Sequence, residues 1–202
     1  MSEIIDLLYA ASSGKSEMIR ELLSKGANIN GTDKDGNTAL ICALSNGHEE
    51  VARILINSGA NITKSSNDCY TPMMYAARSG LSEMIQLLYD KGAKLNGVYD
   101  DSYWEHDTPM EMAIRKNHPG TVEKLCSIGA EMKNEDPLTN YLWLPSINGH
   151  VEIVKILCKY GADTKKRCIG GTPLKLAVEG DHVEIVKILC EYGADTNLLN
   201  ND

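Results

Sequence analysis

Histidine is the residue type whose spacing in this chain first suggests chemistry, since imidazole serves both acid–base catalysis and metal binding. Four of the five histidines occupy corresponding positions in successive segments: His48, His118, His150 and His182. His48, His118 and His182 each follow a threonine by ten residues. A residue that recurs in this way serves the recurring structure first. We therefore expect these side chains to be structural turn residues.

The fifth histidine, His106, lies between Glu105 and Asp107. Imidazole and carboxylate together can bind a metal ion, but no second histidine lies nearby, and the alternative is a solvated turn. The sequence has no glycine-rich phosphate loop, no Gly-x-Ser-x-Gly and no Cys-x-x-Cys motif. We therefore expect no catalytic residues, no metal and no other cofactor, and an enzyme is the weakest of the functional hypotheses.

The elements that position these residues form a repeat. Its marker is a Gly-Ala pair, found at Gly26-Ala27, Gly59-Ala60, Gly92-Ala93, Gly129-Ala130, Gly161-Ala162 and Gly193-Ala194. Successive pairs lie 33, 33, 37, 32 and 32 residues apart. A period of this length is typical of stacked repeat arrays. Such an array presents one long surface and usually encloses no catalytic pocket.

Each repeat has the pattern of two short helices. A threonine such as Thr172 can cap a helix by accepting a free backbone N–H, and Pro173 suits the first helical position, where no donor is needed. A buried apolar stripe marks the second helix, most clearly at Val151, Val154 and Leu157. The Gly-Ala glycines suit the left-handed residue that ends a helix. The sequence therefore predicts a turn, a helix, a short loop and a second helix in each repeat.

These motifs resemble the ankyrin repeat family over almost the whole chain. The family pattern is Thr-Pro-Leu-His-x-Ala, then Gly-His, then an apolar helix that ends in Gly-Ala-Asp. Residues 172–177, which read Thr-Pro-Leu-Lys-Leu-Ala, and residues 193–195 match it best. The resemblance implies an all-α ankyrin-repeat solenoid of stacked helix-turn-helix units with projecting turns. It implies one domain with repeats at 1–29 (an N-terminal cap), 30–62, 63–95, 96–132, 133–164 and 165–202 (a C-terminal cap).

Two adjacent repeats depart from this pattern. Gly92 and Thr108 are four residues further apart than the corresponding residues of the preceding repeat. In the ankyrin architecture the stretch 97–107 that contains the insertion is a projecting turn. The next repeat has Pro145 where its first helix is expected, and proline in a helix interior costs about 3 kcal/mol. We expect this proline to shorten or kink the helix.

The composition favours an intracellular protein with a protein partner. The chain has 202 residues and a net charge of -8, which argues against nucleic acids and anionic membranes as partners. It lacks a run of about 18 apolar residues that could span a membrane, and its N-terminus lacks the layout of a signal peptide. We expect a monomer in the cytoplasm, which would be the cytoplasm of a host cell if the protein is an effector.

The six cysteines have the spacing of the repeat rather than that of a disulfide framework. Cys126, Cys158 and Cys190 recur at 32-residue steps in one slot of the second helix, and we expect them to be core thiols. The other three are expected in a first helix and in two separate turns. We therefore predict that all six are reduced.

Partner contacts are expected at the turns and on the inward ends of the first helices, because aromatic residues and arginine carry most interface energy. The candidates are Asp68, Tyr70, Tyr75, Arg78, Tyr99, Asp100, Asp101, Tyr103, Trp104, Glu105, Asp107, Arg115, Trp143 and Ile147. Local packing is the alternative for each, and above all for Trp143, which fills the slot of the family histidine. The acidic residues of the inserted turn would suit a basic segment of the partner.

The sequence thus favours a non-enzymatic protein–protein interaction module that binds a partner protein on its concave face and its inserted turn. A preordered surface of this kind loses little entropy on binding. One alternative is an inhibitor or immunity-type protein that blocks an enzyme, and another is an intracellular scaffold or effector. A complex that abolishes the partner's turnover would favour the inhibitor, and a complex that leaves it intact would favour the scaffold.

Overall fold

The computed structural model describes residues 2–96, 108–131 and 140–196. These ranges form helices and two isolated β-bridges, between Thr32 and Thr38 and between Cys168 and Gly171. The all-α class expected from the sequence is confirmed. The chain divides into an N-terminal unit, Met1–Pro109, and a C-terminal unit, Met110–Asp202. The inserted stretch 97–107 and the C-terminal residues 197–202 lie outside the described residues.

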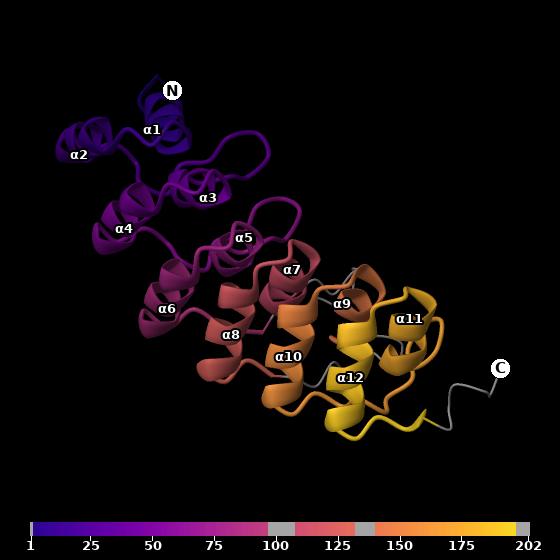
Figure 1. Ribbon diagram of the computed structural model, residues 1–202. Helices are drawn as coiled ribbons and strands as arrows, with labels where there is room; N and C mark the ends of the chain where they lie inside the picture. The colour runs from indigo at the N-terminus through magenta and orange to yellow at the C-terminus, as the bar shows by residue number, and fades with distance from the viewer. Residues whose placement is uncertain (1, 97–107, 132–139, 197–202) are drawn as a thin grey trace. The chain divides into compact units, whose positions relative to one another are not determined.

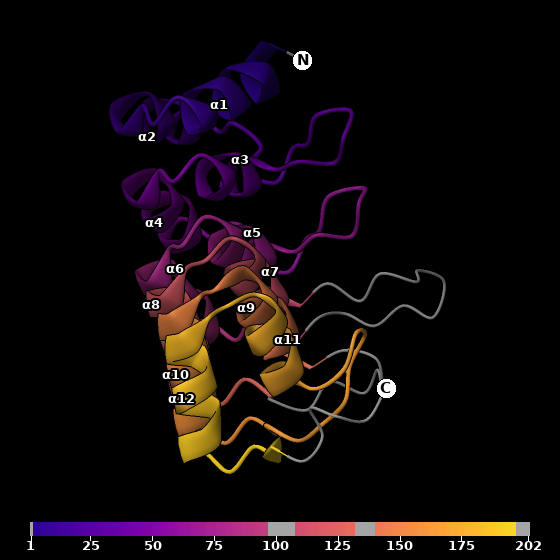
Figure 2. The same ribbon diagram turned by 45° about the vertical axis from the view of Figure 1, so that its right-hand side comes forward.

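The N-terminal unit consists of three stacked helix pairs (Figure 1). The helices are α1 (Ser2–Ser12), α2 (Ser16–Ser24), α3 (Ala39–Ser45), α4 (Glu49–Asn57), α5 (Pro72–Arg78) and α6 (Ser82–Asp90). The first helices stack as α1 on α3 on α5, and the second helices as α2 on α4 on α6. The turns that precede α3 and α5 project on the side away from the second helices (Figure 2).

The C-terminal unit repeats this arrangement. Its helices are α7 (Pro109–Arg115, of which Pro109 is the last residue of the N-terminal unit), α8 (Pro119–Ser127), α9 (Trp143–Asn148), α10 (Val151–Lys159), α11 (Pro173–Glu179) and α12 (Val183–Glu191). The helix α10 packs between α8 and α12, and α9 packs on α11. Fully buried aliphatic side chains such as Leu125, Leu142 and Leu157 form the core of this unit.

The helix boundaries follow from the capping residues that the sequence indicates. The hydroxyl oxygens of Thr38 and Thr172 each accept the backbone N–H three residues later at 3.2 Å, and Thr71 does the same at 3.3 Å. The glycines of the Gly-Ala pairs have φ between 83° and 91°, a region that favours glycine. These local predictions are confirmed.

Pro145 is accommodated at the start of a short helix. The helix α9 has six residues, one fewer than α11, so the expected shortening is observed. Pro145 is its third residue, where a backbone nitrogen needs no helical acceptor. The expectation that this proline lies in a helix interior was therefore wrong, and the interior penalty does not apply.

The histidines of the repeated slot connect neighbouring helix pairs. The Nε2 atom of His48 donates to the carbonyl oxygen of Ser12 at 3.0 Å. In the C-terminal unit, Nε2 of His182 donates in the same way to the carbonyl oxygen of Ile147 at 3.0 Å. Each bond ties the start of a second helix to the end of the first helix in the preceding pair, so at these two positions the histidine is a structural turn residue.

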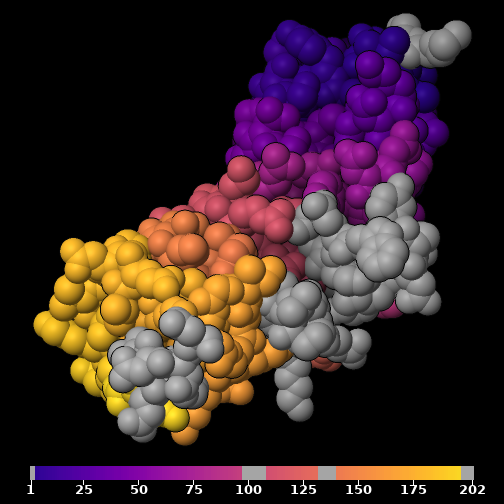
Figure 3. Space-filling model, turned by 90° about the vertical axis from the view of Figure 1, so that its right-hand side faces the viewer, coloured from indigo at the N-terminus to yellow at the C-terminus, as the bar shows by residue number. Residues whose placement is uncertain are grey.

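The repeated cysteines are core thiols at two of their three positions. Cys126 and Cys158 are buried, whereas Cys190 is exposed, so the expectation for Cys190 was wrong. Cys190 lies on α12, the last α-helix of the described residues, against which α10 packs as the neighbouring second helix, and the two C-terminal helices are yellow in Figure 3. All six cysteines are free, with no disulfide among them.

Candidate protein-binding surface

One face of the first helices carries an exposed position that recurs seven residues after each cap. In the N-terminal unit this position holds Ser45 and Arg78, and in the C-terminal unit it holds Arg115, Ile147 and Glu179. All of these side chains are exposed. We call Arg115, Ile147 and Glu179 the first-helix row. Arg78, Arg115 and Ile147 of this position are among the sequence candidates.

The candidates of the N-terminal unit gather at the turn before α5. The rings of Tyr70 and Tyr75 meet edge to face, with centroids 6.0 Å apart and planes at 87°. The Tyr75 hydroxyl donates to Oγ of Ser66 at 3.4 Å, across the turn. Both tyrosines are half-buried, so they fix the turn as well as present a surface. Asp68 is exposed at the tip of this turn.

A second turn of the N-terminal unit supports this one. The backbone N–H of Asn67 donates to the carbonyl oxygen of Asp35, and its side-chain amide donates to that of Lys34, both at 3.0 Å. A Cβ atom on Gly36 would meet Asn67, so the close approach of the two turns requires glycine there. The turn that holds Asp68 and Tyr70 is thereby preordered by its neighbour.

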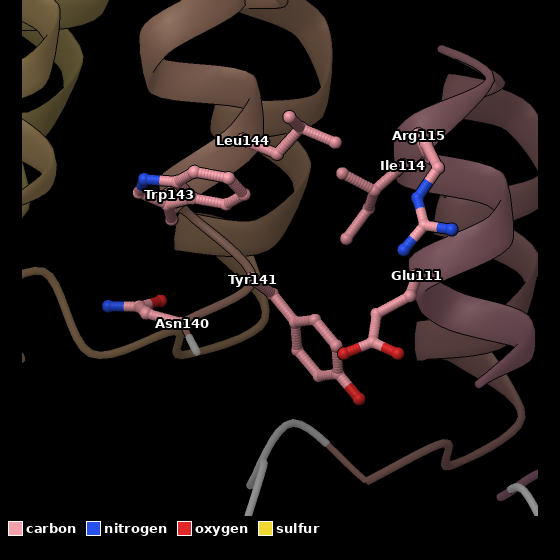
Figure 4. Close-up of a pocket in the computed structure, with 7 residues that line it drawn as sticks. All are labelled: Glu111, Ile114, Arg115, Asn140, Tyr141, Trp143 and Leu144. Carbon is pink, nitrogen blue, oxygen red and sulfur yellow. The ribbon is translucent and has the colours of Figure 1, made fainter. Parts of the chain in front are cut away.

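The C-terminal unit has a hollow of about 360 Å³ between α7 and the start of α9. Its lining is mostly apolar and consists of Glu111, Ile114, Arg115, Asn140, Tyr141, Trp143 and Leu144. In Figure 4 the side chains of Ile114 and Arg115 on α7 face the same space as Leu144 on α9. Tyr141 lies below them, beside the carboxylate of Glu111.

Asn140 also lines the hollow, and it is not among the residues predicted from the sequence. Its Oδ1 accepts the backbone N–H of Leu142 at 2.9 Å. Its amide donates to the carbonyl oxygen of Asp163 at 2.9 Å and to that of Lys166 at 3.3 Å. Asn140 lies 32 residues before Thr172 and therefore occupies the slot of the capping threonine. This 32-residue spacing, which equals the repeat period, is the sequence signal that could have identified Asn140.

The structure brings two of the sequence candidates to one hollow. Arg115, on the last turn of α7, and Trp143, the first residue of α9, both line it. Trp143 is half-buried, so it both packs against its surroundings and presents a surface. Ile147 lies one helical turn beyond Trp143 and is 42% exposed, which extends the apolar surface along α9.

The remaining candidates belong to the inserted turn. They are Tyr99, Asp100, Asp101, Tyr103, Trp104, Glu105 and Asp107, and all lie outside the described residues. Their contribution to a partner site stays a prediction.

The described ranges hold neither a metal-binding cluster nor a membrane-spanning helix. No group of three or more His, Cys, Asp or Glu side chains there could hold a metal ion. No helix of 2–96, 108–131 or 140–196 is long and apolar enough to cross a membrane.

Comparison with known proteins gives one family. A family model described as ankyrin repeats in three copies matches residues 7–66, 63–136 and 113–200. The crystal structure of the human ASB11 ankyrin repeat domain has 26% sequence identity and a TM-score of 0.83, covering 94% of this chain and 84% of that one. An ankyrin repeat domain from Acinetobacter baumannii AYE has 28% identity and a TM-score of 0.79, covering 94% and 98%. No curated protein matches the sequence.

Proposed function

The chain belongs to the ankyrin repeat family, and we propose that it binds a partner protein through the hollow between α7 and α9 and through the first-helix row. Ankyrin repeats generally mediate protein–protein interaction, and their domains are typically not enzymes. The observation that carries the proposal is the lining of the hollow, which includes Trp143, Tyr141 and Arg115. These are the residue types that dominate binding energy at protein interfaces.

The hollow has the size and rigidity of an anchor site. Its volume of about 360 Å³ lies at the lower end of the range of small-molecule pockets, about 300–1,000 Å³, which suits one or two side chains of a partner. Its walls are helices, and the bonds of Asn140 to the loop that follows α10 fix the start of α9. A partner side chain would thus enter a preordered space, which lowers the entropic cost of binding.

We also propose that the inserted turn contacts the partner, together with Tyr70 and Asp68 of the N-terminal unit. The support is the sequence, because the turn departs from the repeat length and combines aromatic with acidic residues. Trp104→Ala should weaken partner binding by about 2 kcal/mol and leave the melting temperature nearly unchanged. If the variant unfolds but its remaining folded molecules bind the partner as tightly as the wild type does, the role of Trp104 is structural instead.

Site-specific photocrosslinking tests the proposed surface. A benzophenone amino acid replaces Ile147 on α9 in one protein and the exposed Lys155 on α10 in a control. After irradiation in cell extract, we expect a discrete protein adduct from position 147 and none from position 155. The adduct should disappear when Leu144→Trp fills the hollow, provided that the melting temperature shows the variant to be folded. Equal adducts from both positions, or an adduct unaffected by filling, would place the binding surface elsewhere.

A further inference from the structure

We infer that the partner segment is an extended peptide with an acidic, an apolar and a basic residue on one face. This inference rests on the proposed function and specifies the partner class of the same surface. The first-helix row presents Arg115 on α7, Ile147 on α9 and Glu179 on α11, which is a positive, an apolar and a negative position in succession. A partner that binds across the first helices therefore contacts a cationic, an apolar and an anionic side chain in a fixed order.

The three residues of the row lie at one level because they occupy one slot of the repeat. Each stands seven residues after the capping position of its repeat, at Thr108, Asn140 or Thr172. The helix α9 packs on α11, and α7 and α9 together line the hollow (Figure 4). The row thus runs across the first helices rather than along one of them.

Arg115 and Glu179 of the row each follow an oppositely charged residue by one turn of the same helix. Lys175 lies one turn before Glu179, with its Nζ 4.0 Å from a Glu179 carboxylate oxygen, but 23% of its side chain is exposed against 57% for Glu179. Glu111 likewise lies one turn before Arg115 and is half-buried, whereas Arg115 is exposed. In both pairs the member of the row is the more exposed one, so an approaching partner meets a cation at α7 and an anion at α11.

The spacing of the row sets the spacing of the peptide residues. Packed helices such as α9 and α11 lie about 8–10 Å apart, and with the same step taken from α7 to α9 the row spans about 16–20 Å. An extended chain rises about 3.3 Å per residue, and roughly six residues therefore separate the acidic from the basic side chain. The apolar side chain enters the hollow between α7 and α9 and stands nearer the acidic end. The pattern Asp-x-Leu-x-x-x-Lys meets these demands, because its three specified side chains share one face of an extended strand.

Fluorescence anisotropy with four synthetic peptides tests the pattern on the full chain. Each peptide has serine at every x and neutral ends, and the four read Asp-x-Leu-x-x-x-Lys, Lys-x-Leu-x-x-x-Lys, Asp-x-Leu-x-x-x-Asp and Asp-x-Ser-x-x-x-Lys. We expect the first to bind most tightly. Each like-charged peptide should bind about fivefold more weakly, and the peptide without leucine tenfold or more weakly.

Charge reversal in the protein provides the sharper measurement. Arg115→Glu should invert the preference, so that the Lys-x-Leu-x-x-x-Lys peptide binds about fivefold more tightly than the first. Lys116→Glu is the matched control, because it makes the same charge change at the adjacent exposed residue, directly after the end of α7. We expect the control to keep the original order of the four peptides. A merely structural role of Arg115 would lower all four affinities without inverting any.

The outcomes separate this inference from the proposed function. If all leucine peptides bind equally, or if Lys116→Glu inverts the preference as strongly as Arg115→Glu, the charge pattern is wrong while the binding surface stands. If none of the peptides binds, the inference is also wrong, and crosslinking at position 147 decides independently whether the surface binds a protein.

Discussion

The helices α10 and α12 share one sequence over eight residues, Val-Glu-Ile-Val-Lys-Ile-Leu-Cys, yet they have different surroundings. In α10, Ile156 and Cys158 are 5% and 4% exposed, because α8 and α12 cover the helix on both sides. In α12, Ile188 is half-buried and Cys190 is exposed. Burial in a stacked array is therefore set by the neighbouring pair as much as by the residue's own slot.

The largest expected difference between the two helices concerns thiol reactivity. Burial raises the pKa of the Cys158 thiol from 9.0 to about 11, which alone lowers its thiolate fraction about a hundredfold near neutral pH. Cys190 is exposed. Iodoacetamide labelling followed by peptide mass spectrometry should therefore modify Cys190 at least about a hundredfold faster than Cys158.

Cys126 is the internal control for this labelling. It is buried in α8 with its pKa raised to about 11, chiefly by burial, and should react as slowly as Cys158. Equal rates at Cys158 and Cys190 would show that the outer face of α12 is covered in solution and would remove the difference between the two helices.

The different burial of α10 and α12 should also appear as different losses of stability when the corresponding isoleucines, Ile156 and Ile188, are truncated to alanine. Ile156→Ala removes a side chain enclosed on both sides and should lower the free energy of unfolding by about 3 kcal/mol. Ile188→Ala removes the same side chain from a half-buried position and should cost about 1.5 kcal/mol or less. Urea denaturation followed by circular dichroism measures both. A cost at Ile188 equal to that at Ile156 would contradict the open outer face.

The first helices of the same two pairs differ in how they begin. Thr172 caps α11 through one hydrogen bond, at 3.2 Å. Asn140 holds the start of α9 through one bond to its own segment and two to the loop after α10. We expect Asn140→Ala to cost about 2 kcal/mol and Thr172→Ala about 1 kcal/mol in the same denaturation measurement. A larger cost at Thr172 would show that the two loop bonds of Asn140 contribute little.

These pairs also show what the sequence could and could not predict. Thr172, Gly161 and Gly193 were predictable because a cap and a left-handed stop act within a few residues of chain. Cys190 was mispredicted because the slot indicates a core position, whereas the residue is buried only where another pair stacks on it. Pro145 was mispredicted because a shift of the helix start by two residues turns an interior position into a first-turn position.

The candidate site was predictable only in part, because some of its residues are brought together by contacts between distant segments of the chain. Arg115, Trp143 and Ile147 could be chosen by residue type and slot. Glu111 and Tyr141, with the hollow that they help to line, depend on the space between α7 and α9. Asn140 has a slot that the period identifies, but its bonds reach a loop more than twenty residues away. Local sequence patterns do not encode such contacts.

The smallest expected effect separates the histidines that begin α10 and α12. His182 donates to the Ile147 carbonyl oxygen at 3.0 Å, whereas Nδ1 of His150 is buried without a hydrogen-bond partner among the described residues. Burial of the ring, and secondarily the charge of His182, lowers the pKa of His150 below its usual 6.5. Protonation therefore favours the unfolded chain, and stability falls as the pH drops below about 6.5 toward the folded pKa.

The His150 contribution is best measured as a difference between variants, because carboxylates titrate in the same acid range. The free energy of unfolding is compared at pH 7 and pH 5.5 for the wild type, His150→Gln and the control Asn148→Gln, a neutral change at an exposed position. Between pH 7 and pH 5.5, the wild type and the control should lose more free energy of unfolding than His150→Gln does. The difference should be less than about 1 kcal/mol, because the ring is only half-buried and water screens its charge. An equal loss in all three proteins would show that His150 is as readily protonated in the folded chain as in the unfolded one. The unpartnered nitrogen would then not distinguish the start of α10 from that of α12.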